Sequence, residues 1–352
     1  MTDVPPQRVL VRLPNWIGDL VMATPALAAL RRHWPSAELT VAGPPHAGPL
    51  LAGTELHDRL IELPSRRVAG LAGLRGSVKA LKAGEHDLAF VFTNSFSSAL
   101  VVALAGIRSR IGYVGGGRTL LLTHRVFRGR EAGYHQMPVP MVEQYFRLLE
   151  AANVPRGSPR TVLATTEQEE CEAEAWLKKM DLEGPEPLFG IHPGSSFGPS
   201  KLWYPEKFAA VADELSARWG GRVIVFCGPS EQGLARSIAV AANCRPVTAA
   251  DVPLGLGALK AVVRRLKLLV TTDTGPRHLG PAFDVPTVVV MGSTDPRFTN
   301  TNLERSLVVR SGVDCSPCQR KVCPIDHRCM TRLEPAHVLA ASERLLAGSL
   351  KG

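Results

Sequence analysis

The sequence contains no hydrophobic run long enough to cross a membrane. Its longest strongly apolar stretch, residues 99–107, is much shorter than the roughly 20 residues that a membrane-spanning helix needs. The first residues, "MTDVPPQR", lack the apolar segment of a signal peptide. These two absences argue against an integral membrane protein and a secreted precursor, and we expect a soluble, cytoplasmic protein.

Several other features are absent. Aromatic residues make up only 6% of the chain, and neither an RNA-stacking motif nor a long basic tail is present, so we expect no nucleic-acid partner despite the net charge of +9. Short repeats and low-complexity tracts are missing, which excludes fibrous and disordered classes. The dinucleotide fingerprint, the P-loop pattern and Asp-x-Asp do not occur, so we expect no bound cofactor and no metal clamp for a diphosphate.

The chain has 352 residues, 45% of them hydrophobic and 21% charged, enough for two globular domains. Strand-like apolar runs alternate with helical patterns in both halves, which is typical of parallel sheets covered by helices on both faces. We therefore predict an α/β protein of two doubly wound, Rossmann-like domains that face each other across a cleft. The domains are residues 1–165 and 166–352, divided at a Pro-, Gly- and Ser-containing linker, and the last helix, 335–347, could pack on either.

The predicted elements follow from the periodicity of apolar residues. In the first half the strands are 8–13, 38–42 and 88–92, with helices at 20–33, 97–105 and 141–154. In the second half the strands are 188–193, 222–228, 266–273 and 286–292. Helices are predicted there at 168–180, 205–219, 231–242, 255–265 and 276–283. Ligands of such sheets bind at the carboxyl ends of the strands, so the segments that follow the strands are the candidate sites.

The segment "RLPNWIGDLVMATP" (residues 12–25) follows the first strand and carries an acid among apolar neighbours. Its helix begins either with Thr24 as the cap and Pro25 in the first turn, or near Gly18 with a kink at Pro25. In both cases Asp19 lies at the carboxyl end of the strand. It either caps the helix or acts as a general base on a hydroxyl, and the residues alone do not decide between these two roles.

The segment "HPGSSFGPSKLW" (192–203) follows a strand of the second half. Small residues there allow backbone N–H groups to approach an anion closely, and a lysine adds a charge for phosphate oxygens. The alternative is a plain surface loop. The candidate donor-binding residues in this segment are Gly194, Ser195, Ser196 and Lys201.

Two more strands of the second half run into turns with polar residues. In "TTDTGPRHLGPAFDVP" (271–286) the start of a helix could offer free amides to a diphosphate, or the turn could be an ordinary cap followed by a surface histidine. In "FCGPSEQGL" (226–234) an acid could accept hydrogen bonds from ribose hydroxyls, or be a solvated residue of the first helical turn. The candidates are Asp273, Thr274, Gly275, His278 and Glu231.

The segment "CSPCQRKVCPIDHRC" (315–329) places four thiols and an imidazole within fifteen residues. Such a set can bind zinc, and a cytosolic location argues against disulfides. The second pair is spaced C-x5-C, unlike most zinc ribbons. Zinc bound by Cys315, Cys318, Cys323 and Cys329 and free thiols in a tight loop both remain open.

Together these segments resemble glycosyltransferase family 9, the lipopolysaccharide heptosyltransferases, and most of all its heptosyltransferase II branch. The resemblance rests on "RLPNWIGDLVMATPALAAL", "TNSFSSAL", "RIGYVGGGR", "GSSFGPSKLWYPEKFA", "TTDTGPRHLGPAFDVPTVVVMGSTDP" and the cysteine segment, which follow in family order over nearly the whole chain. One departure is the pair Pro276 and Arg277, where smaller or apolar residues are common.

The resemblance implies a metal-independent, inverting glycosyltransferase with a GT-B fold and ADP-L-glycero-D-manno-heptose as donor. It implies that Asp19 is the catalytic base, that Lys201 binds phosphate and that Glu231 lies near the adenosine ribose. The other donor residues would be Asp273, Thr274 and Gly275, with His278 in the same motif, and the acceptor residues would be Asn94 and Arg118.

The implied acceptor is the inner core on lipid A, whose phosphates and carboxylates suit a basic protein at the anionic cytoplasmic face of the inner membrane. We expect a monomer in peripheral contact with that surface. Two alternatives remain: an enzyme of the same fold with another nucleotide sugar or glycan acceptor, and a nucleotide- or glycan-binding protein without activity.

Overall fold

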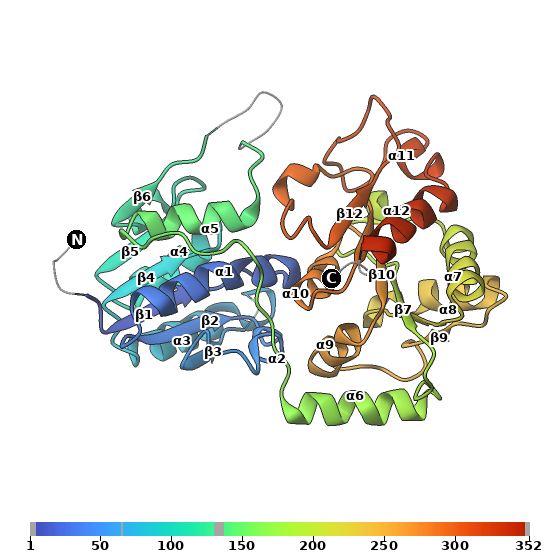
Figure 1. The fold of residues 1–352 in the computed structure, drawn as a ribbon. Helices are drawn as coiled ribbons and strands as arrows, with labels where there is room; N and C mark the ends of the chain where they lie inside the picture. Colours follow the sequence, from blue (N-terminus) through green and yellow to red (C-terminus); the bar gives the residue numbers. More distant parts are fainter. Residues whose placement is uncertain (1–4, 65, 130–136, 349–352) are drawn as a thin grey trace. The chain divides into compact units, whose positions relative to one another are not determined.

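The computed structural model describes residues 5–64, 66–129 and 137–348. The chain divides into two compact units (Figure 1). The first unit consists of residues 1–163 together with 297–301, and the second of residues 164–296 and 302–352. The sequence placed the division after residue 165 and gave no sign that the short segment 297–301 groups with the first unit.

The first unit is built on a sheet of six parallel strands in the order β3-β2-β1-β4-β5-β6. In register, Val9 of β1 pairs with Leu39 of β2 on one side and with Leu88 of β4 on the other. The central strands carry apolar side chains that are buried on both faces of the sheet, as is usual for parallel sheets. The strands are β1 (Arg8–Arg12), β2 (Glu38–Gly43), β3 (Arg59–Glu62), β4 (Leu88–Val91), β5 (Ser109–Tyr113) and β6 (His124–Val126).

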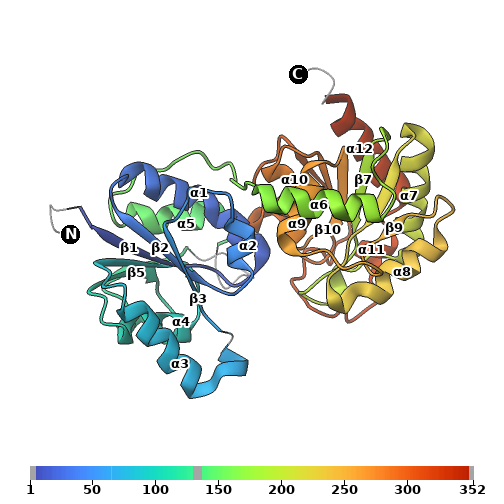
Figure 2. The ribbon, with the colours of Figure 1, turned by 90° about the horizontal axis from the view of Figure 1, so that it is seen from below.

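In the described part of this unit the helices are α1 (Ile17–His33), α2 (Ala47–Leu51), α3 (Arg66–Lys82), α4 (Phe96–Leu104) and α5 (Met141–Glu150). Figure 2 shows α1 and α5 on one face and α3 and α4 on the other. Helix α1 begins at Ile17 and continues through Pro25, so the second of the two predicted starts is correct. Thr24, buried within it, donates to the Val21 carbonyl and does not cap the helix.

The second unit repeats this plan. Its sheet has six parallel strands in the order β12-β11-β10-β7-β8-β9. A second core lies between this sheet and α7, α8 and α12, built from large side chains such as Trp203, Phe208 and Ile238. The strands are β7 (Leu188–His192), β8 (Arg222–Val225), β9 (Val247–Thr248), β10 (Leu268–Thr272), β11 (Thr287–Val290) and β12 (Ser306–Val309). The helices are α6 (Glu167–Lys179), α7 (Pro205–Trp219), α8 (Gln232–Ala241), α9 (Leu256–Arg264), α10 (Leu279–Ala282), α11 (Arg328–Thr331) and α12 (Pro335–Gly348).

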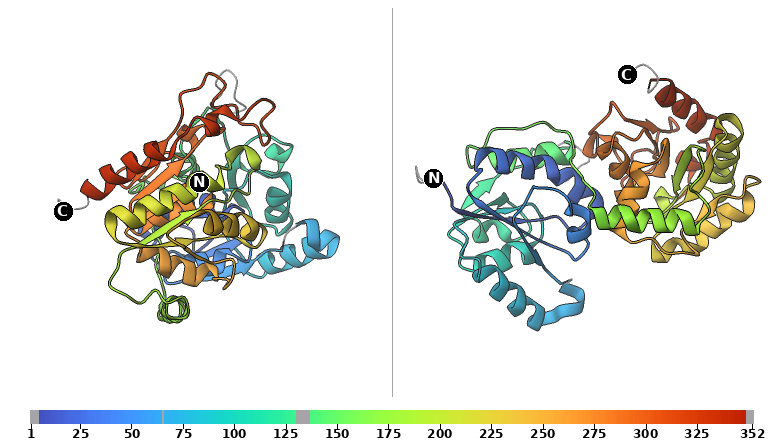
Figure 3. Two further views of the ribbon diagram at one scale, coloured as in Figure 1. Left: turned by 90° about the vertical axis from the view of Figure 1, so that its right-hand side faces the viewer. Right: turned by 60° about the horizontal axis from the view of Figure 1, so that its bottom comes forward.

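Helices lie on both faces of the second sheet, with α6 and α9 on the side opposite to α7 and α12 (Figure 3). Helix α6 starts with a capping box between Thr166 and Glu169. The same Glu169 accepts from the fully buried Lys260 of α9 at 3.2 Å, which ties the two helices together. The last helix, α12, packs on α7 and on strands β11 and β12 of this unit, which answers the question that the sequence left open.

The predicted fold class, two doubly wound Rossmann-like domains, is confirmed in each unit. One predicted element is wrong: residues 276–283 do not form one helix, because a 3-10 turn over 275–278 precedes the single turn of α10. No helix within the described ranges is both long enough and apolar enough to span a bilayer.

Candidate functional sites at the carboxyl edges of the two sheets

In the first unit the predicted residues follow three adjacent strands. Asp19 follows β1, Asn94 follows β4, and Arg118 follows β5, so all three lie at the carboxyl edge of one sheet. Asp19 is the third residue of α1 and half-buried. The cap position is Trp16, which makes no side-chain capping bond, so Asp19 is not the N-cap residue.

A buried phenol lies close to Asp19. Tyr145 of α5 is 1% exposed, and its hydroxyl has no hydrogen-bond partner among the described residues. Burial first, and then the negative charge of Asp19, raises the pKa of this phenol well above its usual value. The charge of the acid predicted as a base therefore acts on a neutral, buried hydroxyl.

The pair Asn94 and Arg118 is joined directly. The Arg118 guanidinium donates to the Asn94 backbone carbonyl, and weakly to the Asn94 side chain at 3.5 Å. It also donates to the carbonyls of Tyr113 at 2.6 Å and Val114 at 3.1 Å. Burial lowers the Arg118 pKa, yet a guanidinium stays charged near neutral pH. Backbone carbonyls thus orient this cation.

A second arginine, which the sequence did not single out, joins the same cluster. Arg128 donates to Asn94 Oδ1 at 2.7 Å, and its guanidinium lies 4.1 Å above the ring of Tyr113. Asn94 therefore links two arginines at the carboxyl edge. Such an arrangement can bind phosphate or carboxylate groups, which are what paired guanidinium groups recognise.

In the second unit, Lys201 and Asp273 form a buried ion pair. The Lys201 ammonium is 2.6 Å from Asp273 Oδ2 and donates to the Asp273 backbone carbonyl at 2.8 Å. The same ammonium lies 4.9 Å from the centre of the Phe197 ring. Lys201 follows β7 and Asp273 follows β10, which are neighbouring strands. Two segments that the sequence identified separately therefore meet at one point.

Two further donors bind the Asp273 carboxylate. Arg277 donates to Oδ1 at 2.7 Å, and the Thr294 hydroxyl donates to Oδ2 at 2.6 Å. Burial alone would raise the pKa of Asp273, but Arg277 and Lys201 together with the hydrogen bonds hold it well below its usual range. The carboxylate is thus ionised and accepts hydrogen bonds on both oxygens, so it holds Lys201, Arg277 and Thr294 together.

His278 is buried, with 5% of its surface exposed, so the alternative of a surface histidine is wrong. Burial and the charge of Arg277 lower the pKa of His278 to about 3, although Asp273 acts in the opposite direction. The ring is therefore neutral at physiological pH. Thr274 and Gly275 precede it in the turn, and the Thr274 N–H donates to the Thr272 carbonyl, so the expected free amide at Thr274 is absent.

Glu231 is held in the 3-10 turn that follows β8. Its carboxylate accepts from the Gly228 N–H at 2.9 Å, and its side chain is 16% exposed, so it is not a solvated residue. A Cβ atom on Gly194 would lie only 1.9 Å from Glu231 Oε1, which explains the glycine there. Two predicted segments therefore meet at this point too. Ser195 and Ser196 follow Gly194 in the loop; Ser196 is exposed, whereas the Ser195 hydroxyl is buried without a partner among the described residues.

The cysteine segment supports the lysine loop. Ser200 donates its N–H to the Lys321 carbonyl at 3.1 Å, and its hydroxyl bonds to Ser293 Oγ at 3.0 Å and to the Arg320 carbonyl. His327 contacts the Ser200 carbonyl at 3.0 Å. Gly198 fits only because it lacks a side chain, since a Cβ there would lie 2.6 Å from the Lys321 carbonyl oxygen. The segment therefore fixes the loop that presents Lys201.

The four thiols of this segment are free. Cys315 and Cys318 are exposed, Cys323 is intermediate and Cys329 is buried. Burial, and then the neighbouring thiols, raises the pKa of Cys329 to about 11. Within the described part of the chain, no group of three or more His, Cys, Asp or Glu residues is arranged to hold a metal ion.

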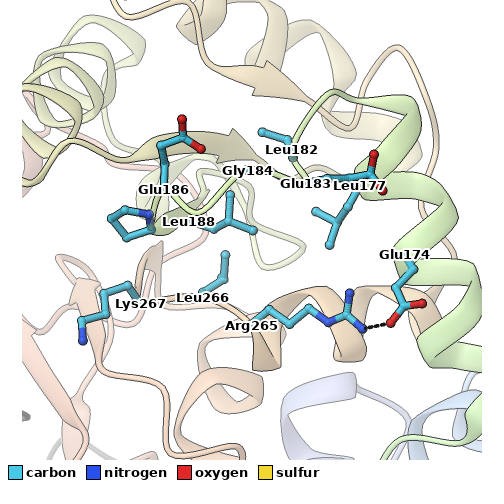
Figure 4. Close-up of a pocket in the computed structure, with 11 residues that line it drawn as sticks. Glu174, Leu177, Leu182, Glu183, Gly184, Glu186, Leu188, Arg265, Leu266 and Lys267 are labelled. Atoms are coloured by element: carbon cyan, nitrogen blue, oxygen red, sulfur yellow. Dashed lines mark hydrogen bonds and ion pairs between the residues drawn. The ribbon is translucent and has the colours of Figure 1, made fainter.

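A pocket of about 530 Å³ lies elsewhere in the second unit, where β7 and β10 begin (Figure 4). It is lined by leucines and by charged residues, including Arg265, whose guanidinium pairs with Glu170 at 2.8 Å and Glu174 at 2.9 Å. None of the predicted site residues lines it. Ligands of parallel sheets bind at the opposite, carboxyl edge, so we do not place the active site in this pocket.

Comparisons with known proteins place the chain among sugar transferases. A family model described as glycosyltransferase family 9 (heptosyltransferase) matches residues 75–328. Lipopolysaccharide heptosyltransferase 2 of Escherichia coli (strain K12) is 29% identical over 314 residues, which cover 86% of this chain and 88% of that protein. Lipooligosaccharide heptosyltransferase 2 of Campylobacter jejuni subsp. jejuni serotype O:2 is 25% identical, with 97% of this chain and 99% of that protein covered.

The fold agrees with these relatives. The solved structure of E. coli ADP-heptose LPS heptosyltransferase II matches with a TM-score of 0.80 and 25% identity, over 97% of this chain and 99% of that one. The predicted GT-B type of fold is thereby confirmed.

Proposed function

The chain belongs to glycosyltransferase family 9 (heptosyltransferase), and from this we propose that it transfers L-glycero-D-manno-heptose from ADP-heptose to the inner core of lipopolysaccharide. Its relatives in E. coli and C. jejuni are named heptosyltransferases of lipopolysaccharide and lipooligosaccharide. The observation that carries the proposal is the cluster around Asp273, where Lys201 is held at the carboxyl edge of the second sheet. This is where a nucleotide-sugar diphosphate would bind.

In this proposal the second unit binds the donor. The Lys201 ammonium offsets the charge that develops on the leaving ADP, and Asp273 holds that ammonium in place. The loop of Gly194, Ser195 and Ser196 and the turn of Thr274 and Gly275 provide small residues and hydroxyl groups for the diphosphate and the heptose. Glu231 and His278 complete the donor site, with Glu231 at the ribose.

The first unit binds the acceptor. Arg118 and Arg128, linked by Asn94, face the phosphate or carboxylate groups of the inner core. Asp19 accepts the proton of the acceptor hydroxyl while that oxygen attacks the anomeric carbon. The bond from the anomeric carbon to the diphosphate oxygen breaks as the new bond forms, ADP leaves, and the configuration inverts. No step of this mechanism uses a metal ion or another cofactor.

The acceptor is a membrane glycolipid, so the enzyme works at the cytoplasmic face of the inner membrane. A net charge of +9 favours peripheral contact with that anionic surface. We propose a monomer for the active form and no role for nucleic acid.

A transfer assay tests the proposed reaction. The purified protein is incubated with core acceptors that carry zero or one heptose, and with either ADP-heptose or ADP-mannose as donor. We expect heptose transfer from ADP-heptose, with product of inverted anomeric configuration by NMR and undiminished rate in the presence of EDTA. Transfer from another nucleotide sugar alone would overturn the proposed donor, and absence of any transfer would favour a binding protein.

The variant Asp19→Asn tests the base. Removing a general base typically lowers kcat by about 10²- to 10⁴-fold, and we expect a loss in that range with unchanged affinity for ADP. Glu206→Gln is the matched control, because Glu206 also lies in the first turn of a helix, α7, but is exposed and outside the site. A folded Asp19→Asn protein with near wild-type kcat would refute the assignment.

A further inference from the structure

One buried histidine of the second unit has no role in the mechanism above. His192 is the last residue of β7, directly before the Pro193–Gly194 turn, and only 6% of its surface is exposed. Its Nδ1 atom is buried and has no hydrogen-bond partner in the part of the chain that the structure describes. Because Nδ1 has no partner, the chemistry of this ring depends on what its other nitrogen faces.

The other ring nitrogen faces Glu231. His192 Nε2 lies 3.7 Å from Glu231 Oε2, which is longer than a hydrogen bond. The carboxylate cannot easily move closer, because Oε2 accepts from the Gly228 N–H at 2.9 Å and Oε1 lies against Gly194. The two groups are therefore held apart by two segments of the chain, the end of β7 with Gly194 and the turn from Gly228 to Glu231.

The protonation of the ring follows from its surroundings. Burial lowers the pKa of His192, and the opposing effects of Glu231 and of the residue's own backbone do not restore it, so the ring is neutral near pH 7 and carries one N–H. Among the described residues Nδ1 has no acceptor in hydrogen-bonding geometry, and an orphaned buried N–H is rarer than an orphaned acceptor. The proton therefore belongs on Nε2, the nitrogen that faces Glu231.

A donor and an acceptor at this separation suit a hydroxyl group. One oxygen at about 2.8 Å from each atom can accept from an N–H and donate to a carboxylate at the same time. We propose that His192 Nε2–H and the Glu231 carboxylate together bind one ribose hydroxyl of the nucleotide, and that His192 thereby makes the site select ribonucleotides. This inference rests on the proposed function, which places a nucleotide ribose at Glu231.

The test measures the affinity of ADP, 2′-deoxy-ADP and 3′-deoxy-ADP by isothermal titration calorimetry. For the wild-type protein we expect ADP to bind at least about tenfold more tightly than one of the two deoxy analogues, because hydrogen bonds to charged groups contribute strongly. The variants His192→Phe and His192→Asn lack a donor at the Nε2 position, and the preference should fall by at least about threefold, to what the Glu231 carboxylate alone provides. His192→Gln places an amide N–H near that position and should keep most of it.

Control variants separate this role from a structural one. His86→Phe makes the same exchange at another buried histidine, in the first unit, and should leave the preference intact. Circular dichroism checks that each variant is folded, and His192→Asn serves if His192→Phe does not fold. Adding Glu231→Gln to His192→Asn should lower the remaining preference further, since the carboxylate is then the one charged partner left for the hydroxyl.

The possible failures are distinguishable. A folded His192→Asn protein with the wild-type preference, or a His192→Gln protein that loses as much as His192→Asn, would overturn the role of His192. A wild-type protein that binds ADP without distinguishing the deoxy analogues would do the same and leave the proposed function standing. A wild-type protein that does not bind ADP would instead refute the proposed function.

Discussion

The two sheets orient their cations at the carboxyl edge in different ways. In the first unit Arg118 donates to the backbone carbonyls of Tyr113, Val114 and Asn94. In the second unit Lys201 and Arg277 share one carboxylate, Asp273. Carbonyl dipoles orient a guanidinium without cancelling its charge, whereas a carboxylate neutralises a cation.

This difference suits the proposed roles of the two units. A cation held by carbonyls keeps its charge for an external anion, as an acceptor rich in phosphates would require. A cation paired with a buried carboxylate is fixed in position, as a leaving diphosphate requires for stabilisation in the transition state. The comparison also predicts that replacing one residue, Asp273, lowers the unfolding free energy more than replacing any one residue of the first cluster.

The largest expected effect is therefore at Asp273. Asp273→Asn removes the charge that compensates Lys201 and Arg277, both of which are largely buried. Breaking such a buried pair costs about 3–5 kcal/mol of unfolding free energy. We expect this loss in urea unfolding at pH 7, followed by tryptophan fluorescence.

The matching change in the first unit is Arg118→Gln. It leaves carbonyl acceptors without donors, which costs about 1–3 kcal/mol in the same experiment. If the two variants lost equal stability, or if Arg118→Gln lost more, the proposed difference between the two clusters would be wrong. Because the measurement is of folding, its outcome does not depend on whether the enzyme is active.

The pH dependence of stability tests the second cluster at a neutral side chain, His278. The pKa of His278 is about 3 in the folded protein, against an ordinary value of 6.5. Between these two values the unfolded chain binds the proton and the folded chain does not, so His278 makes the protein lose stability as the pH falls below 6.5. From pH 7 to pH 5 this one group accounts for about 2 kcal/mol of unfolding free energy.

The variant His278→Asn removes that dependence. We expect the urea midpoint of the wild-type protein to fall more steeply between pH 7 and pH 5 than that of the variant, while the variant is the less stable protein at pH 7. Other groups titrate in both proteins, so their contributions cancel when the pH profile of the variant is subtracted from that of the wild-type protein. Parallel pH profiles for the two proteins would show that His278 can be protonated in the folded state.

Much of the fold could be predicted because the central strands are unambiguous. Strands β1, β7, β10 and β11 are apolar runs buried on both faces, and each was found from the sequence. The strands that the sequence did not predict are β3, β5, β6, β9 and β12. Both β3 and β6 are partly exposed edge strands with charged residues, β9 has only two residues, and β5 and β12 are only partly buried. Tertiary pairing defines these strands, since their local sequence does not.

The site was predictable where a residue lies in the loop or turn that follows a strand. Asp19, Lys201, Glu231 and Asp273 all occupy such segments, which is why position and residue type sufficed to make them candidates. The roles of Asn94 and Arg118 came from the family resemblance alone.

Other site residues escaped detection because their importance depends on long-range packing. Thr294 is 21 residues from Asp273, and Arg128 is 34 residues from Asn94. Tyr145 and His192 look like ordinary core residues in the sequence, and only their buried, unpartnered polar atoms single them out.

The smallest expected effect concerns the turn that presents Arg118. Gly117, the residue before it, has φ of +77°, a left-handed conformation that costs other residues about 1–2 kcal/mol. A Cβ there would contact the ring of Phe96 at 3.4 Å, which is ordinary packing, so backbone strain dominates. Gly117→Ala should therefore lower the unfolding free energy by about 1 kcal/mol.

The matched control for this change has the opposite expected sign. Gly233 is exposed in helix α8 of the second unit, and a Cβ there would meet no atom within 4 Å. Gly233→Ala should raise the unfolding free energy by about 0.5–1 kcal/mol, because alanine is the better helix former. If Gly117→Ala did not lower the unfolding free energy, the backbone conformation at Gly117 would not be what positions Arg118. The proposal that the backbone positions Arg118, whereas a carboxylate positions Lys201, would then be wrong for Arg118.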